Sequence, residues 1–249
     1  MGQIKRLLTV SLFCFVFSAE ASEALVVKNV SELPVIALES ANARFNLIAI
    51  IGGNGLKNGE GKSKNYLVRE ANFFADQGIN YYLFPNHNKD EKASYDLRMS
   101  SKRLERVEAL VDAVVERNSL PTFLIGFSRG SIETLRIALS IPERVFGIIL
   151  ASGVYKKGGK GNETMASILG SNNLSVPTLV IHHRDDSCVV SPFKEAEYFA
   201  ENSLASKVDL IELSGGNASG RECGPFHFHG FEGIERKTSN EIVGWMNAL

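Results

Sequence analysis

The sequence predicts an α/β protein in which a mostly parallel central sheet is flanked by helices on both faces, with antiparallel strands at its N-terminal edge. Three observations lead to this class. Continuous apolar runs, such as residues 45–51 and 145–150, suit strands that are covered on both faces. Segments with apolar residues at helical spacing, such as residues 101–116, separate these runs. Strand and helix segments alternate along the chain, as the crossover connections of a parallel sheet require.

The elements are expected in the following order. Residues 24–30 and 33–38 are short β-type runs divided by a Ser-Glu pair, which we interpret as an antiparallel pair at the sheet edge. Further strands are expected at residues 45–51, 79–84, 123–127, 145–150, 176–181 and 207–213. Helices are expected at residues 64–77, 101–116, 132–140, 163–169 and 192–202, followed by a closing helix through Trp245. We expect a polar excursion at residues 86–100, and the connection between residues 153 and 176 is too short for a folded cap domain.

Length and composition favour one globular domain. The chain has 249 residues, 44% of them hydrophobic, which is enough to bury a large core. No repeat, linker or low-complexity tract divides residues 22–249, so we expect a single domain there. The net charge is −1 and no basic segment follows the N-terminus, which argues against nucleic acid as a partner. The sequence indicates no cofactor and no obligate partner, and it leaves the oligomeric state open.

The first 21 residues have the three parts of a signal peptide. Lys5 and Arg6 form a positive segment, residues 7–18 are apolar, and residues 19–21 (Ala-Glu-Ala) form an A-x-A cleavage site. We predict cleavage after Ala21 and a periplasmic or secreted mature protein. An uncleaved membrane anchor is the alternative, but the apolar run of about a dozen residues is shorter than the ~20 that span a bilayer. We expect no stable membrane insertion of the mature chain.

Cysteine usage predicts one disulfide in the mature protein. Cleavage removes Cys14 and leaves Cys188 and Cys223, an even pair in a compartment that oxidises thiols. Two separate buried thiols are the alternative. Because the spacings of histidines and cysteines fit no zinc pattern, we expect no metal site.

Residues 123–131, Phe-Leu-Ile-Gly-Phe-Ser-Arg-Gly-Ser, carry the first chemical signal. An apolar run ends there in Gly-x-Ser-x-Gly and opens into a helix. We interpret it as a nucleophile elbow, in which a sharp strand-to-helix turn exposes the hydroxyl of Ser128 above the sheet edge. Side chains at Gly126 and Gly130 would collide with neighbouring backbones that pass close to the turn. Such a short pattern also arises by chance, so its reaction partners must be found elsewhere in the chain.

Three other predicted strand ends carry residues that suit this chemistry. In an open parallel sheet, the loops at the carboxyl ends of the strands converge on one crevice. The strand at residues 176–181 is followed by aspartates, the strand at 207–213 by histidines, and the strand at 45–51 by glycines with backbone N–H groups. We therefore expect a serine, an acid, a histidine and N–H donors at one edge of the sheet.

With this chain order, the sequence resembles the α/β-hydrolase family over almost all of its mature length. Residues 177–186, Pro-Thr-Leu-Val-Ile-His-His-Arg-Asp-Asp, are similar to the family's strand-to-acid segment, commonly P-T-L-x-I-H-G-x-x-D. Matching this spacing selects Asp186 over Asp185 as the acid. The chain departs from the family at His183, where glycine is usual.

The same resemblance implies the histidine and the oxyanion hole. Residues 229–231, His-Gly-Phe, resemble the family's turn into the last helix, which selects His229 over His227. The family analogy also implies the N–H group of Arg129 and an N–H group at Gly53 or Asn54 as the oxyanion donors. An isoleucine precedes these glycines where many members of the family have histidine.

These residue types are needed together. A serine hydroxyl is a poor nucleophile, so a neutral imidazole must take its proton during attack on a carbonyl and return it to the leaving group. Asp186 would fix the tautomer of His229 and stabilise its imidazolium, while the N–H donors would stabilise the oxyanion. The remaining histidines are expected to be structural or solvent-facing: His87, His182, His183 and His227.

The predicted disulfide would act on the same loops. Cys188 lies two residues after Asp186, and Cys223 lies six residues before His229. A bridge between the two cysteines would tie the acid loop to the histidine loop. We hypothesise that it holds the two catalytic side chains in register outside the cell.

The sequence thus predicts an exported serine hydrolase that cleaves carboxylic esters through a Ser-His-Asp triad and an acyl-enzyme intermediate. The absence of a cap favours small acyl groups, or an ester attached to a polymer or other larger molecule. An amide, peptide or thioester hydrolase with the same triad is one alternative. A catalytically silent binding protein on this fold is the other, since a fold does not imply a function. The identity of the substrate stays open.

Overall fold

A computed structural model of the chain describes residues 23–158, 161–203 and 207–249. The predicted signal peptide, residues 1–21, lies outside this part of the chain. Within the described ranges, eight strands form one sheet in the order β1-β2-β4-β3-β5-β6-β7-β8. The strands are β1 (Glu23–Leu25), β2 (Val35–Leu38), β3 (Phe45–Ile50), β4 (Ile79–Leu83), β5 (Thr122–Phe127), β6 (Gly147–Ala151), β7 (Thr178–His183) and β8 (Val208–Leu213).

The strand pairing divides the sheet into an antiparallel edge and a parallel body. β1 pairs with β2, and β2 with β4, in antiparallel fashion. From β4 through β3, β5, β6 and β7 to β8, all neighbours are parallel. The fold class predicted from the sequence, a mostly parallel sheet with antiparallel N-terminal edge strands, is confirmed. Every residue of β5, β6 and β7 is buried, as the continuous apolar runs predict for strands covered on both faces.

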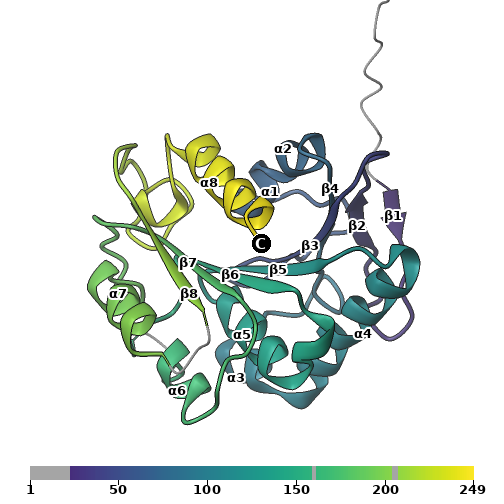
Figure 1. The fold of residues 1–249 in the computed structure, drawn as a ribbon, viewed down its shortest axis with the longest axis horizontal. Coiled ribbons are helices and arrows are strands. Elements are labelled where there is room, and N and C mark those ends of the chain that lie inside the picture. Colours follow the sequence, from purple (N-terminus) through teal and green to yellow (C-terminus); the bar gives the residue numbers. More distant parts are fainter. Residues whose placement is uncertain (1–22, 159–160, 204–206) are drawn as a thin grey trace, which may run out of the picture.

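Helices cover both faces of this sheet (Figure 1). Helices α1, α2 and α8 lie on one face, and α3, α4, α5, α6 and α7 lie on the other. Their bounds are α1 (Tyr66–Arg69), α2 (Ala71–Asp76), α3 (Tyr95–Met99), α4 (Ser101–Asn118), α5 (Gly130–Ser140), α6 (Met165–Leu169), α7 (Phe193–Asn202) and α8 (Glu235–Asn247). The sheet therefore separates two hydrophobic cores, one against each helical layer.

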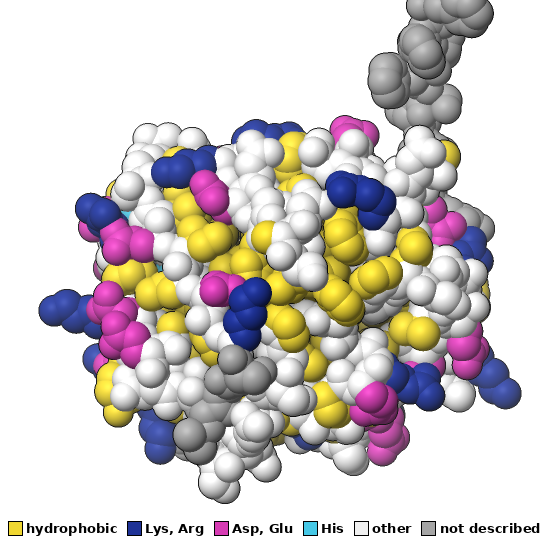
Figure 2. Space-filling model, in the orientation of Figure 1, with side chains coloured by type: hydrophobic (Ala, Val, Ile, Leu, Met, Phe, Trp, Pro, Cys, Tyr) yellow, Lys and Arg dark blue, Asp and Glu magenta, His cyan; other side chains and the backbone are white. Residues whose placement is uncertain are grey.

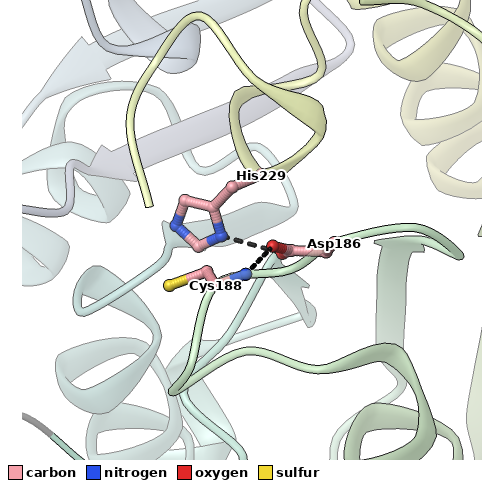
Figure 3. Close-up of side chains that lie close together, drawn as sticks. All are labelled: Asp186, Cys188 and His229. Carbon is pink, nitrogen blue, oxygen red and sulfur yellow. Dashed lines mark hydrogen bonds and ion pairs between the residues drawn. The ribbon is translucent and has the colours of Figure 1, made fainter. Parts of the chain in front are cut away.

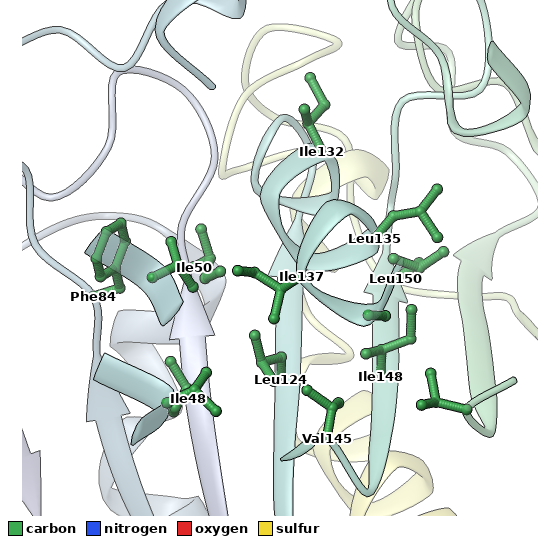
Figure 4. Close-up of a cluster of buried hydrophobic side chains, with 14 of the residues drawn as sticks. Ile48, Ile50, Phe84, Leu124, Ile132, Leu135, Ile137, Val145, Ile148 and Leu150 are labelled. Carbon is green, nitrogen blue, oxygen red and sulfur yellow. The ribbon is translucent and has the colours of Figure 1, made fainter. Parts of the chain in front are cut away.

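Helix α5 is packed on the middle of the sheet. Its side chains Ile132, Leu135 and Ile137 belong to one buried cluster with Leu124 of β5 and Leu150 of β6 (Figure 4). Burying a side chain of this size contributes roughly 1.5–3 kcal/mol. Because α5 begins directly after the predicted elbow, this packing fixes the elbow at the carboxyl edge of the central strands.

Three expected segments differ from the structure. The strand expected at residues 24–30 ends early, and a turn with φ +65° at Asn29 follows it. The helix expected at residues 64–77 is divided into α1 and α2 at Glu70, whose backbone is not helical and whose buried carboxylate accepts a hydrogen bond from α8. The polar excursion contains α3, which begins after Ser94, an N-cap whose hydroxyl accepts a backbone hydrogen bond.

The surface carries charges of both signs. On the face shown in Figure 2, acidic and basic side chains are interspersed around the rim and apolar side chains lie between them. Among the residues that the structure describes, no helix is both long and apolar enough to cross a membrane.

We expect the burial of the central strands to dominate stability. Val180 of β7 is 0% exposed, whereas Val26, after β1, is 83% exposed. Val180→Ala removes two buried carbon groups and leaves a cavity, and should lower the free energy of unfolding by about 2–3 kcal/mol. The matched change Val26→Ala should alter it by less than about 0.5 kcal/mol. Urea denaturation measures both, and equal effects of the two changes would contradict this account of the core.

Candidate active site

Ser128 occupies a strained turn between β5 and α5. Its φ angle is +52°, a conformation that is costly for a residue with a side chain and that persists only when its surroundings enforce it. The Ser128 N–H donates a 2.9 Å hydrogen bond to the Ala151 carbonyl at the end of β6. The Ser128 carbonyl accepts hydrogen bonds from the backbone N–H and the hydroxyl of Ser131. The structure therefore has the strand-turn-helix geometry of a nucleophile elbow.

The glycines around Ser128 are required by close backbone contacts. A methyl group on Gly126 would lie 2.6 Å from the Gly130 carbonyl oxygen. One on Gly130 would lie 2.0 Å from the carbonyl oxygen of Ile50 at the end of β3. The elbow is thus pressed against the neighbouring strand, and both positions exclude any side chain.

Asp186 stands in the loop after β7 with its carboxylate buried. Its Oδ1 accepts a 2.9 Å hydrogen bond from the backbone N–H of Cys188, and its Oδ2 lies 2.8 Å from Nδ1 of His229 (Figure 3). The neighbouring Asp185 is exposed. Of the two aspartates weighed from the sequence, Asp186 is the one that contacts the histidine.

His229 lies in the short 3-10 helix Phe228–Gly230 and is 1% exposed. With a proton on Nδ1 donated to Asp186, its Nε2 is an acceptor, and this atom has no hydrogen-bond partner among the described residues. His227 is also buried, but the structure does not pair it with Asp186. The His229 imidazole is therefore oriented by the acid and left available for a proton from another group.

Ser128 and His229 lie at the same sheet edge without a hydrogen bond between them. The ring of Phe127, the residue before the serine, packs against the ring of His229 with the two ring centroids 5.3 Å apart. No hydrogen bond joins Ser128 Oγ to His229 Nε2, both of which belong to the described part of the chain. Catalytic hydrogen bonds are often long in the absence of substrate and tighten when it binds. The structure thus brings together the acid and the histidine, and the residue next to the serine contacts the histidine ring.

His182, which the sequence led us to expect as a structural or solvent-facing residue, contacts the acid. It is fully buried, and its Nε2 lies 3.2 Å from Oδ2 of Asp186 and 2.7 Å from the Ser191 carbonyl oxygen. Burial alone would raise the pKa of Asp186, but attraction to the protonated form of His229 and hydrogen bonds from His182 and His229 outweigh it. The pKa of Asp186 therefore lies well below its usual range, and the carboxylate stays ionised.

The loop after β3 lies directly beside the elbow. A methyl group on Gly52 would be 2.8 Å from the Cβ atom of Ser128. The loop turns at Gly53, whose φ is +58°, and the Gly55 N–H closes the turn on the Gly52 carbonyl. The backbone N–H groups that family analogy selected have no acceptor among the described residues: those of Gly53, Asn54 and Arg129.

Cys188 and Cys223 form the predicted disulfide, which joins the acid loop to the histidine loop. Their Cα atoms are 4.6 Å apart although 35 positions separate them in the chain. The donor atoms of Asp186, Cys188 and His229 lie within 4.8 Å of one another, as metal ligands do. The Cys188 sulfur is bonded to sulfur and offers no thiolate, so this donor set does not fit a metal ion.

Two further side chains hold the histidine loop in place. His183, at the position where the family usually has glycine, stacks on Phe228 with ring centroids 4.5 Å apart. Arg69 of α1 donates hydrogen bonds of 3.0 Å to the carbonyl groups of Pro225 and Gly230, on either side of His229. Nothing in the local sequence around Arg69 indicates this role, because its partners are some 160 positions away.

This fold, with a serine elbow at the edge of its sheet, defines the chain as an α/β-hydrolase. Residues 77–221 match the phospholipase/carboxylesterase family, and this stretch is more than half of the chain, so the chain belongs to that family. Membership makes it a serine ester hydrolase. A search of curated protein sequences finds no match.

Solved structures agree with this class. The chain is similar to a dienelactone hydrolase from Anabaena variabilis, with 17% identity, 93% of this chain and 99% of that chain covered, and a TM-score of 0.66. It is similar to Est1E from Butyrivibrio proteoclasticus at 12% identity, with coverage of 92% and 98% and a TM-score of 0.66. An esterase from Pyrococcus furiosus matches at 12% identity, with coverage of 92% and 90% and a TM-score of 0.68. At these identities the likeness shows the fold alone.

Removing the disulfide should destabilise the chain. Closing a loop of this length in the unfolded state is worth roughly 3–4 kcal/mol, so Cys188→Ala/Cys223→Ala should lower the free energy of unfolding by about that amount. Urea denaturation without reductant measures the change. Dithiothreitol should destabilise the wild-type protein and leave the double variant unaffected. A denatured, unreduced wild-type protein with two titratable thiols would contradict the assignment.

Asp186→Asn should abolish most of the activity. An asparagine amide in this position favours the wrong tautomer of His229, and we expect kcat for an ester to fall by about 10⁴-fold. Asp185→Asn is the matched control, since Asp185 is exposed and adjacent, and should keep kcat within about twofold. Steady-state ester hydrolysis distinguishes the two, and a comparable loss in both variants would rule out Asp186 as the specific acid.

Proposed function

We propose that this protein is an exported hydrolase that cleaves carboxylic esters with Ser128 as nucleophile, His229 as general base and acid, and Asp186 as the group that orients the histidine. One observation carries the proposal. The buried Asp186–His229 pair leaves His229 Nε2 without a partner at the sheet edge where the strained elbow presents Ser128. A histidine fixed by an acid with one free nitrogen is what a serine nucleophile requires.

The chemistry then proceeds through an acyl-enzyme. His229 Nε2 takes the proton of Ser128 Oγ as that oxygen attacks the ester carbonyl, and passes it to the leaving alcohol as the ester bond breaks. Water then gives a proton to the same nitrogen as it attacks the acyl-enzyme. When the bond from the acyl carbon to Ser128 Oγ breaks, His229 returns that proton to Oγ, which releases the carboxylic acid and restores both side chains. The ionised Asp186 stabilises the imidazolium in both steps.

The oxyanion of each tetrahedral intermediate would be stabilised by backbone donors. The N–H of Arg129 follows the nucleophile directly, and the N–H groups of Gly53 and Asn54 lie on the loop that contacts Ser128 through Gly52. All three donors lack an acceptor in the described part of the chain. Removal of one such donor typically costs about 3 kcal/mol of transition-state stabilisation.

The substrate class follows from the family and the open site. The named activities of the family and of the structural neighbours are phospholipase, carboxylesterase, esterase and dienelactone hydrolase. Between β6 and β7 the described residues form one short helix, α6, rather than a cap. We propose an ester with a small acyl group, or one presented on a larger molecule.

The proposed location is the periplasm or the exterior of the cell. Two features support it: the signal-peptide pattern of residues 1–21 and the disulfide between Cys188 and Cys223. Edman sequencing or mass spectrometry of the mature protein should find an N-terminus at Ser22.

A fluorophosphonate probe tests the nucleophile without knowledge of the substrate. It should label the wild-type protein at Ser128, and Ser128→Ala should lose both labelling and ester hydrolysis, because the activated hydroxyl is gone. Ser140→Ala, at the exposed end of α5, is the control and should keep both. Parallel assays with p-nitrophenyl esters, anilides and thioesters identify the bond that is cleaved. Equal rates of ester hydrolysis in wild type and Ser128→Ala would refute Ser128 as the nucleophile, and a wild-type protein without labelling or hydrolysis would favour a binding protein.

A further inference from the structure

We infer that Arg98 of α3 is a positioning residue that holds the glycine loop after β3 against the nucleophile elbow, an inference that rests on the proposed function of that loop as an oxyanion hole. Arg98 is 0% exposed, which is exceptional for a charged side chain. It does not touch Ser128, Asp186 or His229. Its contacts connect two segments that the proposed reaction needs in fixed relation.

At one end the Arg98 guanidinium forms hydrogen bonds with backbone carbonyl groups of the glycine loop after β3. Its Nη2 donates hydrogen bonds to the carbonyl oxygens of Ile51 at 3.0 Å and Gly53 at 3.3 Å. The Gly52 carbonyl is bound by the N–H of Gly55, and the Asn54 carbonyl by two other donors. With each carbonyl from Ile51 to Asn54 engaged, the peptide planes are fixed and the N–H groups of Gly53 and Asn54 are left for a ligand.

At the other end Arg98 binds the helix of the elbow. Its Nη1 forms an ion pair with Glu133, a fully buried residue in the first turn of α5. Its Nε donates a 3.1 Å hydrogen bond to the carbonyl of Ala93, in the loop before α3. One planar guanidinium therefore links the acceptors of the glycine loop to the helix that starts at the nucleophile, which the single ammonium of a lysine is not able to do with the same geometry.

Arg98 affects catalysis through the distance between the N–H donors of the glycine loop and the oxyanion. Oxyanion donors act when they lie within hydrogen-bond distance of the developing charge, and a displacement of about 1 Å can cost on the order of 100-fold in rate. Without Arg98, the carbonyl groups of Ile51 and Gly53 lose their buried partner, and the loop is free to turn its peptides. Binding of the ground-state ester needs less of this precision.

A second buried arginine provides a matched control. Arg106 of α4 also binds two backbone carbonyls, those of Val30 and Pro85, and one carboxylate, that of Glu91. It contacts neither Glu133 nor the glycine loop. Arg106 is linked to Glu133 only through Glu91 and Arg103. Arg106→Met thus removes a comparable set of buried interactions and leaves the direct hydrogen bonds to the glycine loop in place.

The experiment compares Arg98→Met with Arg106→Met in the mature protein, below the melting temperature of both. Arg98→Met should lower kcat for p-nitrophenyl acetate by about 10- to 100-fold with KM changed by less than about threefold. The affinity for a trifluoromethyl ketone, whose serine adduct carries the oxyanion, should fall by a similar factor. Arg106→Met should lower the melting temperature while kcat stays within about threefold of wild type. Equal losses of kcat and ketone affinity in the two variants, or wild-type kcat in Arg98→Met, would overturn the inference.

Hydrogen exchange provides a readout independent of activity. The amides of Gly55 and Ala93 are hydrogen-bonded to the loop carbonyls of Gly52 and Asn54. In Arg98→Lys, which keeps the charge, exchange at these two amides should speed up relative to wild type, and in Arg106→Lys it should not. Unchanged exchange in Arg98→Lys would overturn the positioning role even where Arg98→Met does not fold. If the wild-type protein neither hydrolyses esters nor reacts with the fluorophosphonate, the proposed function fails, whereas the exchange result still decides whether Arg98 holds the loop.

Discussion

The hydrogen bond between Asp186 and His229 is the contact on which the candidate site depends, because it sets both the direction and the tautomer of the imidazole. Its two residues come from loops 43 positions apart, and three further contacts hold those loops in place. Two of them join the loops directly, the disulfide of Cys188 with Cys223 and the stacking of His183 on Phe228, and the third anchors the histidine loop to α1 through hydrogen bonds from Arg69.

The second requirement is the strained turn at Ser128, which the parallel sheet enforces. The end of β6 accepts the serine N–H, the end of β3 lies in close contact with Gly130, and the apolar face of α5 packs on the sheet. Residues held in a costly conformation persist only where packing determines them several times over. The position of Ser128 is therefore fixed by the central strands, which are the most deeply buried in the molecule.

The ion pairs with little exposure connect separate segments of the chain and add little to the stability of the fold. Glu133 on α5 is shared by Arg98 and Arg103, and Glu91 by Arg103 and Arg106, with little or no exposure of any of them. Removing water from ion pairs offsets most of their attraction, so such pairs add little net stability. Their value lies in geometry, since a guanidinium with five donors fixes several backbone carbonyls at once.

The sequence by itself determined most of the strands and helices along the chain, the fold class, and the pairing of Cys188 with Cys223. These depend on local patterns: apolar periodicity, glycine stops and the count of cysteines. It also selected Ser128 from the Gly-x-Ser-x-Gly pattern after a predicted strand, and Asp186 and His229 from the resemblance of their segments to those of the α/β-hydrolase family. It missed the break at Glu70, the contact of His182 with the acid, and the roles of Arg69 and Arg98. Only the tertiary structure decided these, since each depends on a buried polar group finding its partner in another segment, and no periodicity along the chain records which partner that is.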